Sequence, residues 1–155
     1  MNKFKKIVAF LMAATMIMAM SITSFAATPL ADGVYTANQN LYKDVDCLKK
    51  SMGDEAVNDM WADITISGNK ATLVVHTHEI SYLGITGHLG KMEINGVVQE
   101  PNSKTQAGVK DYYFTFTDLD SSMFYEGCKI TGKFTTYVGS MPMNATGYLR
   151  LTGIQ

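Results

Sequence analysis

The chain has 155 residues, of which 13 are basic and 14 acidic, for a formal net charge of −1. The first 26 residues hold three of the basic side chains and no acidic one, so the remainder carries 10 basic against 14 acidic residues. This acidic balance, without a cluster of lysine and arginine, argues against nucleic acid or an anionic membrane as a partner. The length after residue 26 suits a single domain, residues 27–155, with one hydrophobic core.

The N-terminal segment, residues 1–26, has the pattern of a secretory signal peptide. Three lysines between residues 3 and 6 precede an apolar run from residue 7 to residue 20, and Ser24-Phe25-Ala26 has the spacing that signal peptidase recognises. We predict cleavage after Ala26, with Ala27 as the neighbouring alternative. The apolar run is shorter than a membrane-spanning helix needs. The mature protein is therefore expected to be secreted or extracellular, including association with the cell surface, without insertion into a membrane.

The mature chain begins with one strand and a short helical turn. Residues 30–42 contain the turn signal Asp32-Gly33 followed by β-forming residues, and they predict a first strand. Residues 43–60 mix helix formers with capping residues and a glycine, which predicts a short helix or a single 3₁₀ turn near Ser51. Met52 in this turn is then either a core residue or part of a pocket wall.

From residue 61 onward the pattern is almost entirely that of β-strands. Strand-like stretches lie at 62–66, 71–78, 80–89, 92–94, 97–98 and 112–117. Tight turns are expected at 67–70 and Asn95-Gly96, a polar loop at 101–108 and a connection at 118–126. With a C-terminal hairpin these stretches make seven or eight short strands, which favours an antiparallel sandwich or barrel.

Residues 127–151 predict a β-hairpin whose arms alternate between two faces. We place its tip at 139–144, where Met141 and Met143 flank Pro142. Methionine is apolar and flexible, and it is normally buried. Two methionines at this position therefore indicate either the wall of a ligand pocket or a plug that fills one end of the sandwich.

Cys47 and Cys128 are the two cysteines of the chain, and they lie far apart in sequence. In an oxidising extracellular setting, such a pair can form one disulfide that contributes roughly 2–5 kcal/mol to stability. The alternative is a pair of buried free thiols. Of the two interpretations, the disulfide is favoured.

His76 and His78 are two residues apart on a predicted strand, so their side chains lie on one face. With His88 or Glu79 they could hold Zn²⁺ or Cu²⁺. The opposite face of this strand is the apolar one, however, so the preferred interpretation is two histidines on the solvated face.

The chain contains no motif of a known catalytic site. A G-x-S-x-G elbow, an H-E-x-x-H pair and a phosphate-binding glycine loop are all absent, and neither cysteine has the local signature of a nucleophile. We therefore expect that the chain is not an enzyme.

Six segments of the mature chain follow one another in a characteristic order. They are DGVYT at 32–36, SMG at 51–53, ADITISGNKAT at 62–72, HEISYLGITG at 78–87, YFTF at 113–116 and YLRL at 148–151. In order and spacing they resemble NEAT (near-iron-transporter) domains, the haem-binding sandwiches of Gram-positive surface and secreted proteins. The resemblance covers essentially the whole mature chain. It implies an immunoglobulin-like antiparallel β-sandwich with a short 3₁₀ lip after the first strand.

The resemblance also implies a haem slot between the lip and the last hairpin, with iron held by the first tyrosine of a Tyr-x-x-x-Tyr pattern. This chain departs from that pattern. Alignment on Tyr148 puts Asn144 at the ligand position, whereas alignment on Arg150 puts Met143 there. Haem iron accepts thioether sulfur as an axial ligand, and some haem-binding relatives resemble this chain in using methionine. We therefore expect Met143 as the candidate iron ligand.

Other residues are expected to complete the site. Met52 or Met141 would be an alternative or second ligand, Ser51 would bond a propionate, and Tyr82 would line the apolar face of the macrocycle. The expected haem-binding set is Ser51, Met52, Tyr82, Met141, Met143, Asn144 and Tyr148.

The leading expectation is an extracellular module that captures haem, for iron acquisition, and transfers it to another protein by reversible axial ligation. Two alternatives stay open. One is a similar sandwich without haem that binds a protein or glycan through its hairpin tip. The other is an extracellular Cu- or Zn-binding protein that uses methionine sulfur and histidine.

Overall fold

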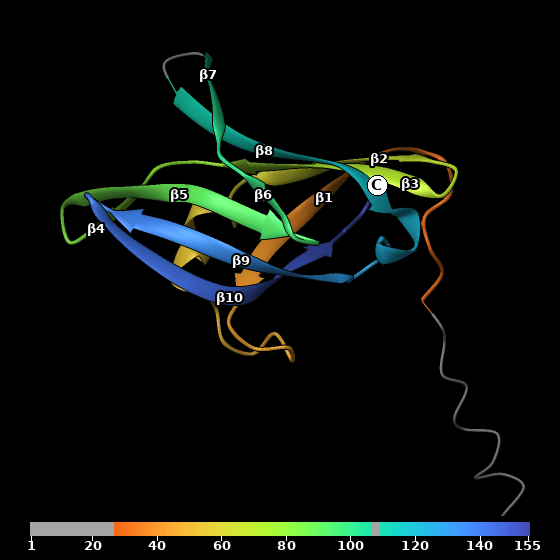
Figure 1. The fold of residues 1–155 in the computed structure, drawn as a ribbon, viewed down its shortest axis with the longest axis horizontal. Helices are drawn as coiled ribbons and strands as arrows, with labels where there is room; N and C mark the ends of the chain where they lie inside the picture. Colours follow the sequence, from red (N-terminus) through yellow and green to blue (C-terminus); the bar gives the residue numbers. More distant parts are fainter. Residues whose placement is uncertain (1–26, 107–108) are drawn as a thin grey trace, which may run out of the picture.

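The computed structural model describes residues 27–106 and 109–155, so the expected signal peptide lies outside the described part (Figure 1). Within that part the chain is all-β, with ten strands and two short 3₁₀ helices. The strands are β1 (Gly33–Tyr42), β2 (Trp61–Ser67), β3 (Lys70–Thr77), β4 (Ile80–Tyr82), β5 (Ile85–Ile94), β6 (Val97–Gln99), β7 (Asn102–Gln106), β8 (Val109–Asp120), β9 (Lys129–Val138) and β10 (Met141–Thr152). The 3₁₀ helices are η1 (Met52–Ala56) and η2 (Ser121–Met123). None of the helices in these two ranges is long and apolar enough to cross a membrane.

The strands form one antiparallel sheet that folds over on itself. Their order is β4-β5-β9-β10-β1-β2-β3-β8-β7, and β6 is attached to β5. One layer, which contains β5, β9 and β10, packs against a second layer of β2, β3 and β8, and β1 joins the two (Figure 1). The core between the layers includes Ile64, Leu73, Phe114 and Phe116 from the second layer and Leu89, Met92, Phe134 and Leu149 from the first. The expected all-β antiparallel sandwich is confirmed.

The C-terminal hairpin is also confirmed, with a shorter tip than expected. β9 and β10 pair from Met141 opposite Val138 to Arg150 opposite Lys129. The turn consists of residues 139 and 140 alone, and its glycine has a φ of +60°, which suits a two-residue hairpin loop. Residues 141–144 therefore belong to β10 and not to the tip.

Two turns flank β5: the turn to β6 was predicted from the sequence, whereas the turn from β4 lies within a stretch that was predicted as one strand. Asn95 and Gly96, with φ of 52° and 77°, connect β5 to β6 as the Asn-Gly signal predicts. Leu83 and Gly84, with φ of 50° and 78°, divide residues 80–89 into β4 and the start of β5. The strand expected at 80–89, whose glycines suggested a bend, is therefore two strands joined by a turn, and Leu83 is 87% exposed in this turn although its apolar side chain fits a strand pattern.

The expected polar loop at 101–108 is mostly a strand. Asn102–Gln106 forms β7, which pairs with β8, and β8 begins at Val109 rather than at residue 112. β7 is at the edge of the sheet, where a polar sequence is compatible with pairing on one side. β7 and the division at Leu83 add strands, whereas the stretch expected at 92–94 is part of β5; the described residues form ten strands, where seven or eight were expected.

Both cysteines are free thiols, which differs from the favoured Cys47–Cys128 disulfide. Cys128 is fully buried in the core between the layers. The next residue, Lys129, points the opposite way, because its ammonium donates to the carbonyl oxygen of Val45 at 2.7 Å, in the loop that carries Cys47. The two thiols therefore lie on opposite sides of this layer, and a bridge would have to pass through the sheet.

Alkylation would test the state of the thiols. Burial raises the pKa of the Cys128 thiol, which lowers its reactivity because the thiolate is the nucleophile. We expect Cys128 to resist iodoacetamide in the native protein, and both cysteines to react in denaturant without a reductant. Mass spectrometry after digestion would check this, and a denatured protein that gains no label before reduction would contradict it.

Candidate functional site

The lip expected after the first strand is helix η1, and a buried carboxylate fixes it to β1. Ser51 caps the helix, with its Oγ accepting a hydrogen bond from Gly53 N at 3.4 Å. Asp54 is 3% exposed and accepts hydrogen bonds from Leu41 N at 2.7 Å and from Asn40 Nδ2 at 3.1 Å. Lys50 forms an ion pair with the same carboxylate at 2.7 Å. This hydrogen bond to Asp54 raises the pKa of Lys50.

Gly53 brings the lip into direct contact with β5 and β9 of the first layer and with β1. A Cβ atom at this position would lie 2.9 Å from Thr136 Oγ1 of β9, 3.1 Å from Leu41 Cδ2 of β1 and 3.3 Å from Leu89 Cδ2 of β5. Only glycine allows so close an approach. Helix η1 therefore lies against the inner face of β9, at the end near the β9–β10 turn.

Met143 lies on the same inner face as Thr136, the residue of β9 that contacts the lip. Thr136, which contacts Gly53, is the register partner of Met143 in β10. Because side chains alternate along β10, Met141 and Met143 share the face of the buried Leu149, but they are 66% and 42% exposed. Met52 on the lip is 41% exposed. The structure thus brings the lip and Met143 to one end of the sandwich, as expected.

Two residues that flank the β4–β5 turn extend this apolar surface. Ile85 Cγ2 would be 3.2 Å from a Cβ at Gly139, so it lies beside the β9–β10 turn. Tyr82 pairs with Ile85 and lies on the same strand face as the buried Ile80. Tyr82 and Ile85 are each 49% exposed. We call the five exposed side chains Met52, Tyr82, Ile85, Met141 and Met143 the apolar strip.

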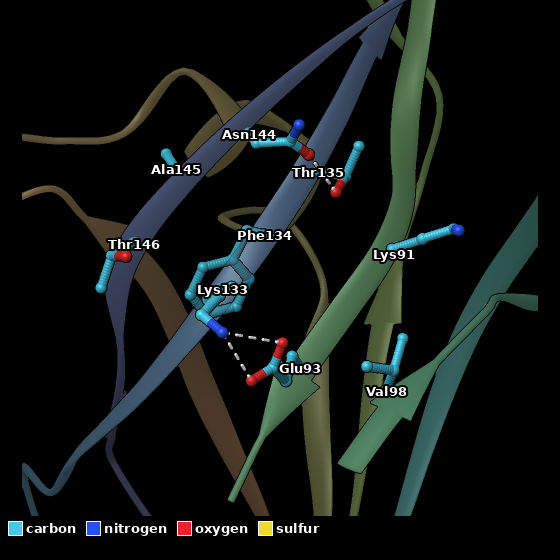
Figure 2. Close-up of a pocket in the computed structure, with 9 residues that line it drawn as sticks. All are labelled: Lys91, Glu93, Val98, Lys133, Phe134, Thr135, Asn144, Ala145 and Thr146. Atoms are coloured by element: carbon cyan, nitrogen blue, oxygen red, sulfur yellow. Dashed lines mark hydrogen bonds and ion pairs between the residues drawn. The ribbon is translucent and has the colours of Figure 1, made fainter. Parts of the chain in front are cut away.

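Asn144 and Tyr148, by contrast, are on the outer face of β10. Figure 2 shows Asn144 beside Thr135, whose Oγ1 donates to Asn144 Oδ1 at 2.7 Å. Asn144 and Thr135 line a hollow of about 440 Å³ across β5, β9 and β10. In this hollow Lys133 forms an ion pair with Glu93 at 2.9 Å. Tyr148 is an even number of residues from Asn144 and shares its face. The structure therefore separates these two expected site residues from Met141 and Met143.

The three histidines lie in three different environments, and one of them corrects the sequence interpretation. His76 is 5% exposed and not solvated: its Nδ1 lies 3.1 Å from Asp111 Oδ2, and its Nε2 lies 3.0 Å from Asp63 Oδ2. Its ring also stacks on Trp61, with centroids 4.5 Å apart. Alternation placed His76 on the correct face, but it did not reveal that Trp61 and two carboxylates cover that face.

The other two histidines have their own partners. His78 Nδ1 lies 2.6 Å from the carbonyl oxygen of Glu79. His88 is stacked between Tyr112 and Tyr137, with centroid distances of 5.6 Å and 5.4 Å. In the part of the chain that the structure describes, no three His, Cys, Asp or Glu side chains come together in a group that could hold a metal ion.

Comparison with family models and with curated proteins identifies no relative of this chain. No protein-family model matches the chain, and no curated protein matches it. The resemblance to NEAT domains therefore depends on the order and spacing of the short segments described above.

Removal of the Asp54 carboxylate would test whether it holds the lip in place. We expect Asp54→Ala to lower the free energy of unfolding by about 2–4 kcal/mol, because it leaves the buried Leu41 N–H without an acceptor. Urea denaturation followed by circular dichroism would measure this. Glu55→Ala, which removes an exposed acid from the same helix, is the matched control and should change stability little. Equal effects of the two variants would contradict the role of Asp54.

Proposed function

We propose that this protein is a haem-binding module that holds haem against the apolar strip, beneath the lip, and releases it to another protein. The observation that carries the proposal is the inner face of β10, which continues beyond the closed core as two half-exposed thioethers opposite the lip. Exposed apolar side chains gathered at one end of a sandwich are typical of a surface that covers a ligand. A macrocycle is a flat, apolar ligand with polar edges, and it suits such a surface.

Thioether sulfur supplies the chemistry for axial ligation. Met143 is the leading candidate because it lies opposite Thr136, which contacts the lip. Met141 lies two residues nearer the turn and is more exposed, and Met52 would approach from the lip. A soft thioether favours reduced iron more than a tyrosinate does, so binding should be stronger in the ferrous state.

The polar groups of the lip suit the edge of the macrocycle. Ser51 Oγ accepts a hydrogen bond from Gly53 N, so its own proton stays available to a propionate. Tyr82, beside Ile85, would pack on the macrocycle. The outer-face position of Asn144 favours ligation from the inner face over alignment of the chain on Tyr148.

An absorbance titration of residues 27–155 with haemin, and then with dithionite-reduced haem, would test the proposal. We expect a saturable Soret shift with one haem per chain, and a spectrum that sharpens on reduction. Met143→Ala should weaken binding about tenfold or more and change the spectrum, because an axial ligand is lost. Asn144→Ala, on the other face of the same strand, is the matched control and should change neither.

Three results would each change a different part of the proposal. No Soret shift in either redox state would reject haem binding, and the apolar strip would then be tested as a surface for a protein partner. A shift that Met143→Ala leaves unchanged, but that Met141→Ala or Met52→Ala alters, would keep haem and change the ligand. A tyrosinate-type spectrum produced by Asn144→Tyr would contradict the inner-face site.

A further inference from the structure

The only tryptophan of the chain, Trp61, stands in a row of side chains on the outer face of the second layer. Trp61 begins β2, where it pairs with Asn38 of β1, and its ring stacks on His76 of β3 with an interplanar angle of 22°. Because β2 lies between β1 and β3, Asn38 and His76 are on opposite sides of the indole. Trp61 is 43% exposed, an unusual amount for so large an aromatic ring.

His76 holds the indole in a fixed orientation. Its two ring nitrogens lie 3.1 Å and 3.0 Å from carboxylate oxygens of Asp111 and Asp63, so the plane of the imidazole is set from both ends. The indole stacks on this buried ring. A ligand that packs on the other side of Trp61 would therefore lose little free energy in ordering the side chain.

A hollow of about 360 Å³ lies on that other side. It is lined by Thr36, Ala37, Asn38, Trp61, Gly153 and Gln155. Apart from Trp61, these residues belong to β1 and to the segment after β10, so the hollow is on the side of the indole away from His76. One face of the ring stacks on His76, and the opposite side of the ring borders the hollow.

The walls of the hollow are held by main-chain hydrogen bonds. Thr36 and Gln155 exchange two of them, at 2.9 Å and 3.0 Å. Glu126 accepts hydrogen bonds from the main-chain N–H groups of Gly153 and Ile154 at 2.8 Å and 2.9 Å. Gly153, at a φ of +61°, also leaves room for the Asn38 amide, which would lie 2.8 Å from a Cβ atom. The site is thus formed before any ligand binds.

The chemistry of the lining selects the class of ligand. It offers an indole, two amide side chains and one hydroxyl, and none of the lining side chains is charged. An anion would find no cationic side chain there, and a wholly apolar ligand would leave the amides without partners. A pyranose ring has an apolar C–H face that packs on an indole and hydroxyls around its edge that bond amides. We propose that this hollow binds a neutral saccharide, stacked on Trp61 and hydrogen-bonded by Asn38 and Gln155.

This site is separate from the apolar strip. Trp61 and Asn38 lie on the outer face of the sheet, whereas Met141 and Met143 are on the inner face of β10. The inference therefore goes beyond haem binding and stands whether or not haem binds.

Fluorescence of the single tryptophan tests the inference directly. Residues 27–155 would be titrated with four neutral oligosaccharides, namely cellohexaose, laminarihexaose, hexa-N-acetylchitohexaose and maltohexaose. We expect at least one of them to shift the emission maximum of Trp61 to shorter wavelength in a saturable manner. Asn38→Ala should weaken binding of that sugar about tenfold, because it removes one hydrogen-bonding partner. Absence of a shift with all four sugars would overturn the inference.

Two further variants separate this hollow from other sites. Trp61→Phe keeps an aromatic ring over His76, so it should fold, and calorimetry should show weaker sugar binding. Lys133→Ala changes the hollow of Figure 2 and should leave sugar binding unchanged. If Lys133→Ala weakens binding and Asn38→Ala does not, the sugar binds in that other hollow and the inference is wrong.

Discussion

The arrangement of the candidate haem site depends on one buried carboxylate. Asp54 belongs to a helix of five residues, too short to be stable without tertiary contacts. A carboxylate out of water needs partners, and Asp54 finds them in Leu41 N, Asn40 Nδ2 and Lys50 Nζ. Two of these three donors belong to β1. The same interaction that satisfies the charge therefore fixes the lip to the strand that joins the two layers.

Side chains alternate between two faces along β10, and this alternation separates the candidate haem ligands from the other expected site residues. Its odd-numbered residues continue the core face and emerge from it as Met143 and Met141, whereas its even-numbered residues form the outer face with Asn144 and Tyr148. A shift of one residue in the pairing would exchange these sets. The paired glycines Gly132 and Gly147, over which Phe134 packs, lie within this hairpin and accommodate the ring on the inner side.

Much of this fold could be predicted because local patterns and tertiary structure agree. The hairpin of β9 and β10, the Asn95-Gly96 turn and the turn of helix after Ser51 all follow from alternation or turn chemistry within a few residues. β7 was missed because a polar edge strand is stabilised by its neighbour and not by its own sequence. The face of His76 was predicted correctly, but its burial depends on Trp61, Asp63 and Asp111, which come from two other strands. The proximity of the lip and Met143 was expected from a family resemblance alone, since no pattern in the residues themselves links positions so far apart in sequence.

The position of β1 has a consequence for how this chain reaches its folded state. β1 is among the first elements of the sequence, yet one of its two edges pairs with β10, the last strand (Figure 1). During synthesis, a chain that has emerged from the ribosome only as far as β9 can pair β1 with β2. The other edge of β1 is then still unpaired. Contacts so distant in sequence form late and slow the folding reaction. Completion of the sheet must therefore wait for the final strand, and until then β1 offers an exposed edge on which chaperones or other unfinished chains can act.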